Sequence, residues 1–207
     1  SINDYVDLVR IAGFDPAVID VDCFALCNAH EVTYGKDEKD SVALVDIGAN
    51  KASVYIIDNG APVFTRDISI GGFQITDKIR SRCRLPYEDA ERIKLGQPTD
   101  KLSVRELQDI FISVANGWVG EVKRVIDFYY SNYPEGAVKK IYLSGGSSRT
   151  PGLDKLFQSK MGIDVGLFNP LGRLECDDQV FDPSYVNYIG SQMAVCFGLA
   201  LRKVNEK

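Results

Sequence analysis

Residues 45–50 read Val45-Asp46-Ile47-Gly48-Ala49-Asn50, a short apolar strand that runs into a glycine turn, and this stretch decides the fold that we expect. A second turn, Ser144-Gly145-Gly146-Ser147-Ser148-Arg149, follows another apolar strand much later in the chain. Glycine permits a positive φ and lets a ligand approach the main chain closely, as phosphate oxygens and a flat adenosine require. The two turns together predict a nucleotide cleft, although either one alone is weak evidence.

The segments around the first turn predict an antiparallel meander followed by helices. Alternating apolar stretches indicate strands over residues 42–47, 52–57 and 63–68, and Asn59-Gly60 is a strong hairpin signal. Helical periodicity and breakers then predict helices over residues 71–83, 88–94 and 104–133, the last one interrupted near Asn116-Gly117.

The two ends of the chain complete a mixed pattern of strands and helices. Before the meander we expect a helix closed by Gly13, a strand over 18–22 and a helix over 23–30. After the long helix we expect a strand over 138–143, a helix from about Pro151, a strand over 163–168 and a closing helix over 185–204. The pattern predicts an α/β fold with a mixed (α+β) sheet.

Composition and charge limit the classes of protein to which the chain can belong. The chain has 207 residues, 45% hydrophobic and 26% charged, which is enough to bury a core in one or two domains. Its net charge of -5 without a basic run argues against nucleic acid or anionic lipid as a direct ligand. Because no apolar stretch approaches the roughly 18 residues of a membrane span, and no signal peptide is readable, we expect a cytoplasmic protein without direct membrane insertion.

The cysteines predict reduced thiols. There are five of them at irregular spacing, which does not fit a secreted disulfide framework. Cys23, Cys27 and His30 could share one helix face and hold zinc, but a second ligand pair is lacking and His30 is the only histidine. Ordinary helix packing is the favoured interpretation.

The first turn carries groups suited to the phosphate side of a nucleotide. Gly48, Ala49 and Asn50 can present backbone N–H groups to a terminal phosphate, and Asp46 can hold magnesium through its water ligands. The alternative is a simple hairpin turn.

The second turn and one helix carry groups suited to adenosine. Gly145 and Gly146 let the base or ribose lie against the backbone, and the Arg149 guanidinium can stack on the base. Glu91 and Lys94 lie three positions apart on one expected helix, so the carboxylate can take ribose hydroxyls while the ammonium reaches the nucleotide. The alternatives are a tightly packed βα turn and a pair of solvated surface charges.

Several segments in order along nearly the whole chain carry a resemblance to a known family. They are Ala12–Pro16 with Ile19-Asp20, Val45–Ala49, Phe64–Ile68 with Gly71-Gly72, Ala90-Glu91 with Lys94, Leu143–Gly146, Asn169-Pro170 and Gly198–Arg202. The chain resembles the actin-like ATPases, a superfamily with a ribonuclease H-like fold shared by actin, FtsA, seventy-kilodalton heat-shock chaperones and sugar kinases. Within it, the chain is most similar to the PilM family of type IV pilus assembly.

The resemblance implies a domain organisation. Residues 39–171 correspond to actin-like domain II, with a small subdomain over about 73–105. Residues 1–38 correspond to the end of domain I, and residues 172–207 to a return segment and closing helix that pack toward domain I. The charged run 36–40 is the expected boundary. The family's other half, with its first phosphate loop, would lie upstream of Ser1.

The resemblance also implies site residues, a cofactor and partners. Asp46–Asn50 resemble the second phosphate loop, Glu91 and Lys94 the adenosine-contacting helix, and Gly145, Gly146 and Arg149 the adenosine loop, for ATP with magnesium. The implied partners are the cytoplasmic N-terminal tail of a PilN-like inner-membrane protein and components of the pilus motor, which would place the chain at the inner membrane through its partners.

Two differences from the usual actin-like pattern favour nucleotide binding over nucleotide hydrolysis. One phosphate loop alone would hold ATP weakly, and Ala49-Asn50-Lys51 stands where many actin-like loops have Gly-Gly-Thr. The sequence also shows no serine, histidine and acid constellation, so at most a weak ATPase is expected. The alternatives are a small-molecule kinase with Asp46 as general base, or a docking module related to FtsA or secretion proteins that binds no nucleotide.

Overall fold

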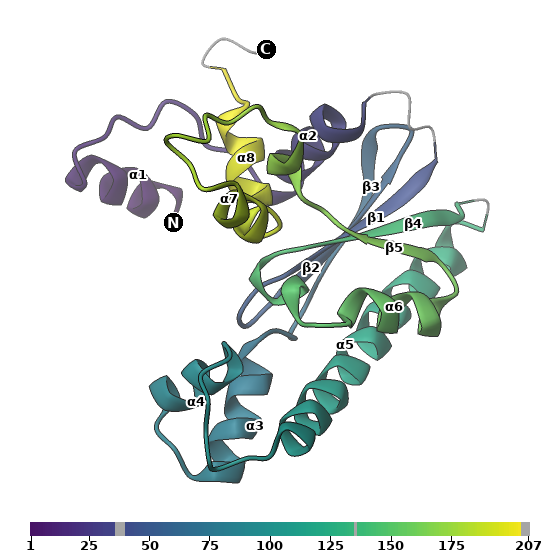
Figure 1. Ribbon diagram of the computed structural model, residues 1–207. Helices are drawn as coiled ribbons and strands as arrows, with labels where there is room; N and C mark the ends of the chain where they lie inside the picture. The colour runs from purple at the N-terminus through teal and green to yellow at the C-terminus, as the bar shows by residue number, and fades with distance from the viewer. Residues whose placement is uncertain (36–39, 135, 204–207) are drawn as a thin grey trace.

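A five-stranded mixed sheet forms the centre of the molecule in the computed structural model, which describes residues 1–35, 40–134 and 136–203 (Figure 1). The strand order is β3-β2-β1-β4-β5. The strands are β1 (Ser41–Ile47), β2 (Ala52–Asp58), β3 (Ala61–Ile68), β4 (Val138–Ser144) and β5 (Asp164–Leu167). β1, β2 and β3 are antiparallel neighbours, whereas β4 runs parallel to both β1 and β5. The expected meander and the mixed sheet are confirmed.

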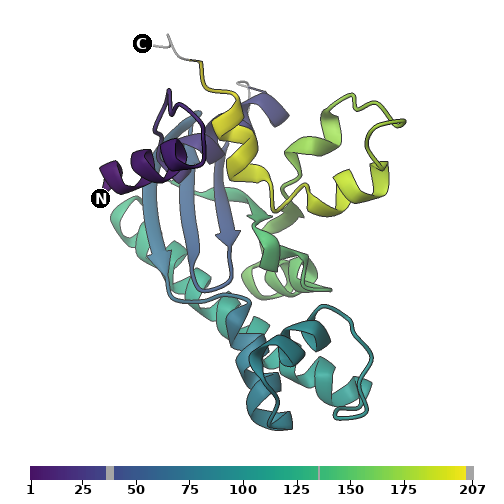
Figure 2. The same ribbon diagram turned by 90° about the vertical axis from the view of Figure 1, so that its left-hand side faces the viewer.

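Helices cover both faces of the sheet. Helices α5 (Val104–Asn132) and α6 (Leu153–Met161) lie on one face, and α2 (Asp22–Tyr34) and α8 (Ala194–Ala200) lie on the other (Figures 1 and 2). Residues 42–45 of β1 are all apolar because alternate side chains of the strand enter two cores: Val45 packs in the core under α5, and Leu44 packs in the core under α2. Burial on both faces accounts for the unbroken apolar run.

A small helical unit extends beyond the end of the sheet at which β1 terminates (Figure 1). It contains α3 (Phe73–Cys83) and α4 (Tyr87–Lys94), and Arg84, in the left-handed region at φ 55°, closes α3 before Pro86 begins the next helix. The indole N–H of Trp118 on α5 donates to Gln74 Oε1 on α3 at 2.6 Å. This bond fixes the helical unit to the long helix.

The remaining elements belong to the two ends of the chain and to turns. They are α1 (Ile2–Ile11), the 3-10 turns η1 (Gly146–Arg149) and η2 (Pro170–Arg173), and α7 (Pro183–Ile189). Apolar side chains of α1 face solvent, with Tyr5 72% and Ile11 84% exposed. No helix in the described ranges combines the length and apolar content that a membrane crossing demands.

Three expectations about the elements are wrong. The predicted strand over 18–22 does not form: Asp22 is the first residue of α2, and residues 18–21 lead into that helix while the buried Asp20 carboxylate pairs with Arg202 Nε at 3.2 Å. Helix α5 continues through Asn116-Gly117 without interruption. The closing helix is divided into α7 and α8, because the turn between them brings the Ser191 carbonyl to the N–H of Gly145 at 2.8 Å.

The predicted domain boundary in the charged run 36–40 lies, except for Asp40, outside the described residues. The domain limits 1–38, 39–171 and 172–207 stay predictions.

Candidate functional site

The two glycine turns lie side by side because their strands are parallel neighbours. Asp46 of β1 is in register with Ser144 of β4, so both turns leave the same edge of the sheet. Ser144 Oγ donates to Asp46 Oδ1 at 2.8 Å, and Ser147 Oγ donates to the Gly48 carbonyl at 2.8 Å. Segments far apart in the sequence thus form one continuous rim.

A third glycine segment closes against the first turn. The N–H of Gly72 donates to the Gly48 carbonyl at 3.1 Å, and the N–H of Phe73 donates to the Ala49 carbonyl at 2.7 Å. A Cβ at Gly71 would lie 2.4 Å from the Ala49 oxygen, so only glycine permits this approach of two backbones. The start of α3 is therefore held directly on residues 48–49.

Glu91 and Lys94 reach this rim from α4. Lys94 Nζ lies 2.7 Å from Glu91 Oε1 and donates to the Gly72 carbonyl at 3.4 Å. Thr76, buried on α3, donates its hydroxyl to Glu91 Oε2. Burial opposes the charged carboxylate, but the hydrogen bonds from Lys94 and Thr76 outweigh it and lower the pKa of Glu91. Glu91 is therefore charged at neutral pH, and its contacts with Lys94 and Thr76 fix its side chain in place.

Asp46 lies in a more buried setting. Burial raises the pKa of its carboxyl, the hydrogen bond from Ser144 opposes that shift, and nearby Asp22 adds to it. Across the described part of the chain, no three or more His, Cys, Asp or Glu side chains gather where they could hold a metal ion. Magnesium usually takes one or two carboxylates together with waters and substrate phosphates, so a single Asp46 fits an ion brought by a nucleotide better than a resident one.

Arg149, the last residue of η1, is held at the end of the second turn, against α7. Its guanidinium carbon lies 4.0 Å from the centre of the Tyr188 ring, and Nη1 donates to the Tyr188 carbonyl at 3.0 Å. Its Nε also donates to the Gly146 carbonyl at 3.4 Å.

The structure thus brings the predicted residues together at one end of the sheet. Asp46, Gly48–Asn50, Gly145 and Gly146 meet there directly, Glu91 and Lys94 join them through Gly72, and Arg149 is hydrogen-bonded to the Gly146 carbonyl of the second turn. Their roles toward a nucleotide stay predictions.

Sequence reasoning missed the side chains that connect these parts. They are Thr76, Ser144, Ser147 and Tyr188. The two serines lie inside the second turn motif and could have been found from the parallel pairing of its strand with β1. Thr76 and Tyr188 carry no local signal, because their partners are distant in the sequence.

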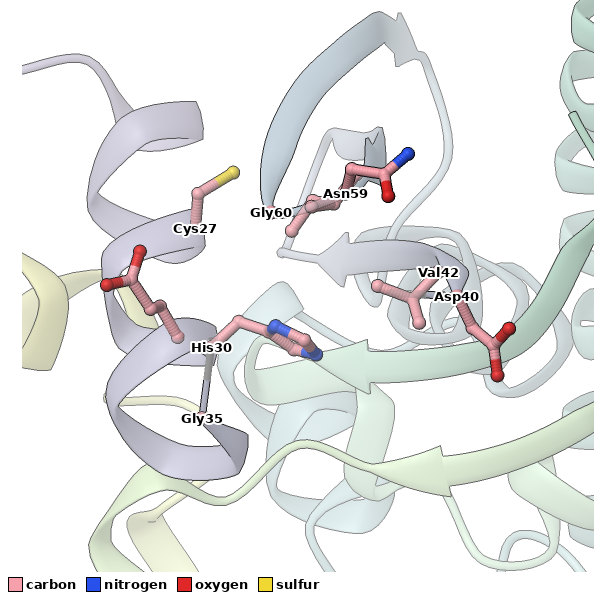
Figure 3. Close-up of a pocket in the computed structure, with 9 residues that line it drawn as sticks. Cys27, His30, Gly35, Asp40, Val42, Asn59 and Gly60 are labelled. Atoms are coloured by element: carbon pink, nitrogen blue, oxygen red, sulfur yellow. The ribbon is translucent and has the colours of Figure 1, made fainter. Parts of the chain in front are cut away.

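The two described cavities lie elsewhere. A cavity of about 290 Å³ between α2 and the β2–β3 hairpin is lined by Cys27, His30, Glu31, Gly35, Asp40, Val42, Ile57, Asn59 and Gly60 (Figure 3). A second, of about 590 Å³, lies between α3, α5 and the end of β3, with Trp118 among its lining residues. None of the predicted nucleotide residues lines either cavity.

Cys23, Cys27 and His30, the considered zinc ligands, pack in the apolar layer under α2. Burial raises the pKa of Cys27 to about 12 and lowers that of His30 to about 4. The His30 ring lies among the rings of Tyr34, Tyr142 and Phe168.

Comparison with known proteins decides the family. A sequence profile of the family described as type IV pilus assembly protein PilM matches residues 1–204. The chain belongs to the PilM family. Its predicted resemblance is thereby confirmed.

This PilM-family chain is also similar to cell division proteins. It is 28% identical to FtsA of Bacillus subtilis over 221 residues, which cover 94% of the chain and 47% of FtsA. It is 27% identical to FtsA of Pseudomonas aeruginosa over 205 residues, covering 89% of the chain and 49% of that protein. The chain spans about half the length of these curated relatives.

Solved structures confirm the actin-like fold. A structure described as a PilM-PilN type IV pilus biogenesis complex matches with a TM-score of 0.85 and 25% identity, over 99% of this chain and 58% of that one. MreB5 of Spiroplasma citri bound to AMPPNP matches with a TM-score of 0.64 and 15% identity, over 96% of this chain and 63% of that one.

Proposed function

We propose that this PilM-family chain is a nucleotide-binding scaffold of the type IV pilus assembly machinery. In this proposal it docks on the cytoplasmic N-terminal tail of a PilN-like inner-membrane protein, and so is cytoplasmic but peripheral to that membrane. The family match and the likeness to a PilM-PilN complex support the partner class. Pilus motor components are further candidate partners.

The convergence of two glycine turns with the Glu91–Lys94 pair carries the nucleotide part of the proposal. Residues 48–50 take the phosphates, Glu91 and Lys94 take the ribose and the nucleotide, and Gly145 and Gly146 receive the adenosine, with Arg149 stacking on the base. Lys94, charged and tied to Gly72, faces the rim where an anion would be placed. Magnesium, when bound with ATP, would neutralise phosphate charge, and Asp46 would hold its waters.

The domain limits complete the proposal. Residues 39–171 form domain II with a subdomain over about 73–105, residues 1–38 are the end of domain I, and residues 172–207 are a return segment and closing helix that pack toward domain I. The solvent-facing apolar side chains of α1 support this assignment, because a neighbouring part of domain I would cover them. ATP bound between the domains would bias the angle between them.

The test uses the native gene product, with its intact mass measured first, and two ligands. Calorimetric titration with ATP and magnesium should give saturable binding, which Lys94→Ala weakens while Lys155→Ala, an exposed lysine on α6, does not. A synthetic peptide of the partner's cytoplasmic tail should bind, and a scrambled peptide should not.

The docking proposal and the nucleotide proposal can be refuted independently of each other. No peptide binding with or without nucleotide overturns the docking proposal. Peptide binding without any ATP binding overturns the nucleotide proposal and favours the docking module, whereas equal ATP affinity of Lys94→Ala and Lys155→Ala refutes the role given to Lys94.

A further inference from the structure

The segment from α7 to Ser191 forms an outer wall against the second glycine turn. The N–H of Gly145 donates to the Ser191 carbonyl at 2.8 Å, and Arg149 Nη1 donates to the Tyr188 carbonyl at 3.0 Å. The atoms nearest to a Cβ built on Gly146 belong to Gln192, at 3.7–3.9 Å. Residues 188–192 thus contact the turn along its length.

The Arg149 guanidinium is oriented by a side chain of α7, that of Tyr188. Its carbon lies 4.0 Å from the ring centre of Tyr188, while Nη1 is fixed to the Tyr188 carbonyl and Nε to the Gly146 carbonyl. A guanidinium has two flat faces, and contact with an aromatic ring occupies one of them. A flexible arginine is thereby held in one plane before any ligand arrives.

We infer that Tyr188 is a positioning residue for the base of the bound nucleotide, acting through Arg149; this rests on the proposed nucleotide function. The Tyr188 ring supports one face of the guanidinium, and the other face stacks on the nucleobase. The stack prefers a purine, since the larger ring system overlaps more of the guanidinium plane.

Pre-organisation explains why the ring matters although it does not touch the ligand. An arginine side chain that is free before binding loses rotamer freedom when it stacks, and that loss lowers affinity. A cation–π contact at an exposed site holds the side chain with a strength that corresponds to roughly a two- to fivefold change in affinity.

The test compares ATP with inorganic tripolyphosphate on the native gene product. Tyr188→Ala should weaken ATP binding roughly two- to fivefold. Tripolyphosphate has no base, so its affinity for the variant should equal its affinity for the parent protein. Tyr188→Phe keeps the ring and should retain ATP affinity. The matched control is Tyr185→Ala, which removes another exposed tyrosine of α7.

Each outcome decides the inference. Unchanged ATP affinity of Tyr188→Ala, with ATP bound by the parent, overturns the role of Tyr188 and leaves the nucleotide function standing. Equal losses for ATP and tripolyphosphate show a structural effect and also overturn it. Absence of ATP binding by the parent removes the proposed function and the inference together. If Tyr188→Ala lowers the unfolding temperature more than Tyr185→Ala does, Tyr188→Leu, which keeps apolar bulk without a π face, replaces it in the same comparison.

Discussion

Adjacent glycines of the second turn should respond in opposite ways to substitution. Gly145 has φ +85°, and a Cβ there would lie 2.4 Å from the Ile47 carbonyl oxygen and 2.8 Å from the Ile47 nitrogen. Both obstacles are backbone atoms of β1, so no side-chain rotation relieves the overlap. At Gly146 the nearest atoms to a Cβ belong to the Gln192 side chain at 3.7 Å or more, an ordinary contact distance. We therefore expect Gly145→Ala to damage the fold and Gly146→Val to spare it.

The size of the Gly145→Ala effect follows from its parts. At φ 85° and ψ 163°, Gly145 lies in a region of backbone space that is essentially restricted to glycine, which costs an L-residue about 1–3 kcal/mol. Displacement of the turn from Ile47 also weakens the Gly145–Ser191 hydrogen bond, worth about 1 kcal/mol. The free energy of unfolding should therefore fall by roughly 2–4 kcal/mol, which for a chain of this size lowers the melting temperature by roughly 5–15 °C. Gly146→Val should stay within about 1 kcal/mol of the parent, but its methyl groups block the backbone approach of adenosine and should weaken ATP binding on the order of tenfold or more.

Thermal unfolding followed by circular dichroism, with calorimetric titration of ATP, separates the two effects. If the melting temperature of Gly145→Ala equals that of the parent protein, the close approach of this turn to β1 is refuted. A Gly146→Val protein that keeps its melting temperature and its ATP affinity refutes the adenosine-loop assignment.

Three further substitutions test the chemistry of buried groups. Asp46→Asn should raise the free energy of unfolding at pH 7, because the pKa of Asp46 is raised in the folded protein and its ionised carboxylate therefore destabilises the fold at that pH. Denaturant titration at pH 7 and pH 3.5 should show a smaller gain in acid, where the carboxyl is largely protonated in both states. An equal gain at both pH values contradicts this. Burial lowers the pKa of His30 to about 4, so the free energy of unfolding should decrease as pH drops below 6.5, by ~1.4 kcal/mol at pH 5.5. His30→Phe should lose this pH dependence of stability between pH 7.5 and 5.5. The same pH dependence in both proteins argues against a neutral buried imidazole. Trp118→Phe removes the donor to Gln74 Oε1 and should cost about 1–2 kcal/mol; a Gln74→Ala background should absorb part of that cost, whereas full additivity speaks against the bond.

Local chemistry made much of the sheet predictable. Asn59 and Gly60 have φ of 48° and 77°, and Asn-Gly is the pair that tolerates such values in a two-residue hairpin. The wrong element predictions came from tertiary contacts that override local preference. Gly117 costs α5 up to about 1 kcal/mol relative to alanine, but burial of Trp118 and Val122 beside it keeps the helix continuous.

The location of the candidate site was predictable, and its internal connections were not. Two strand-turn motifs indicated that Asp46 and Gly145 belong together, and their strands are indeed adjacent. The chain itself gave no sign that Thr76 would reach Glu91 across two helices, or that Arg149 would lie on Tyr188. Such pairs depend on how separate elements pack, which spacing along one element does not encode.

The contact of α2 with α8 has a consequence for the order in which the protein can fold. A Cβ at Gly198 would lie 1.8 Å from the Ala25 carbonyl, so the two helices meet backbone to backbone although nearly the whole chain separates them. During synthesis α2 leaves the ribosome long before α8 exists, so the side of α2 that meets α8 stays uncovered until the last part of the chain is made. That layer of the sheet is therefore completed late, and until then this side of α2 is open to chaperones, proteases and misassembly.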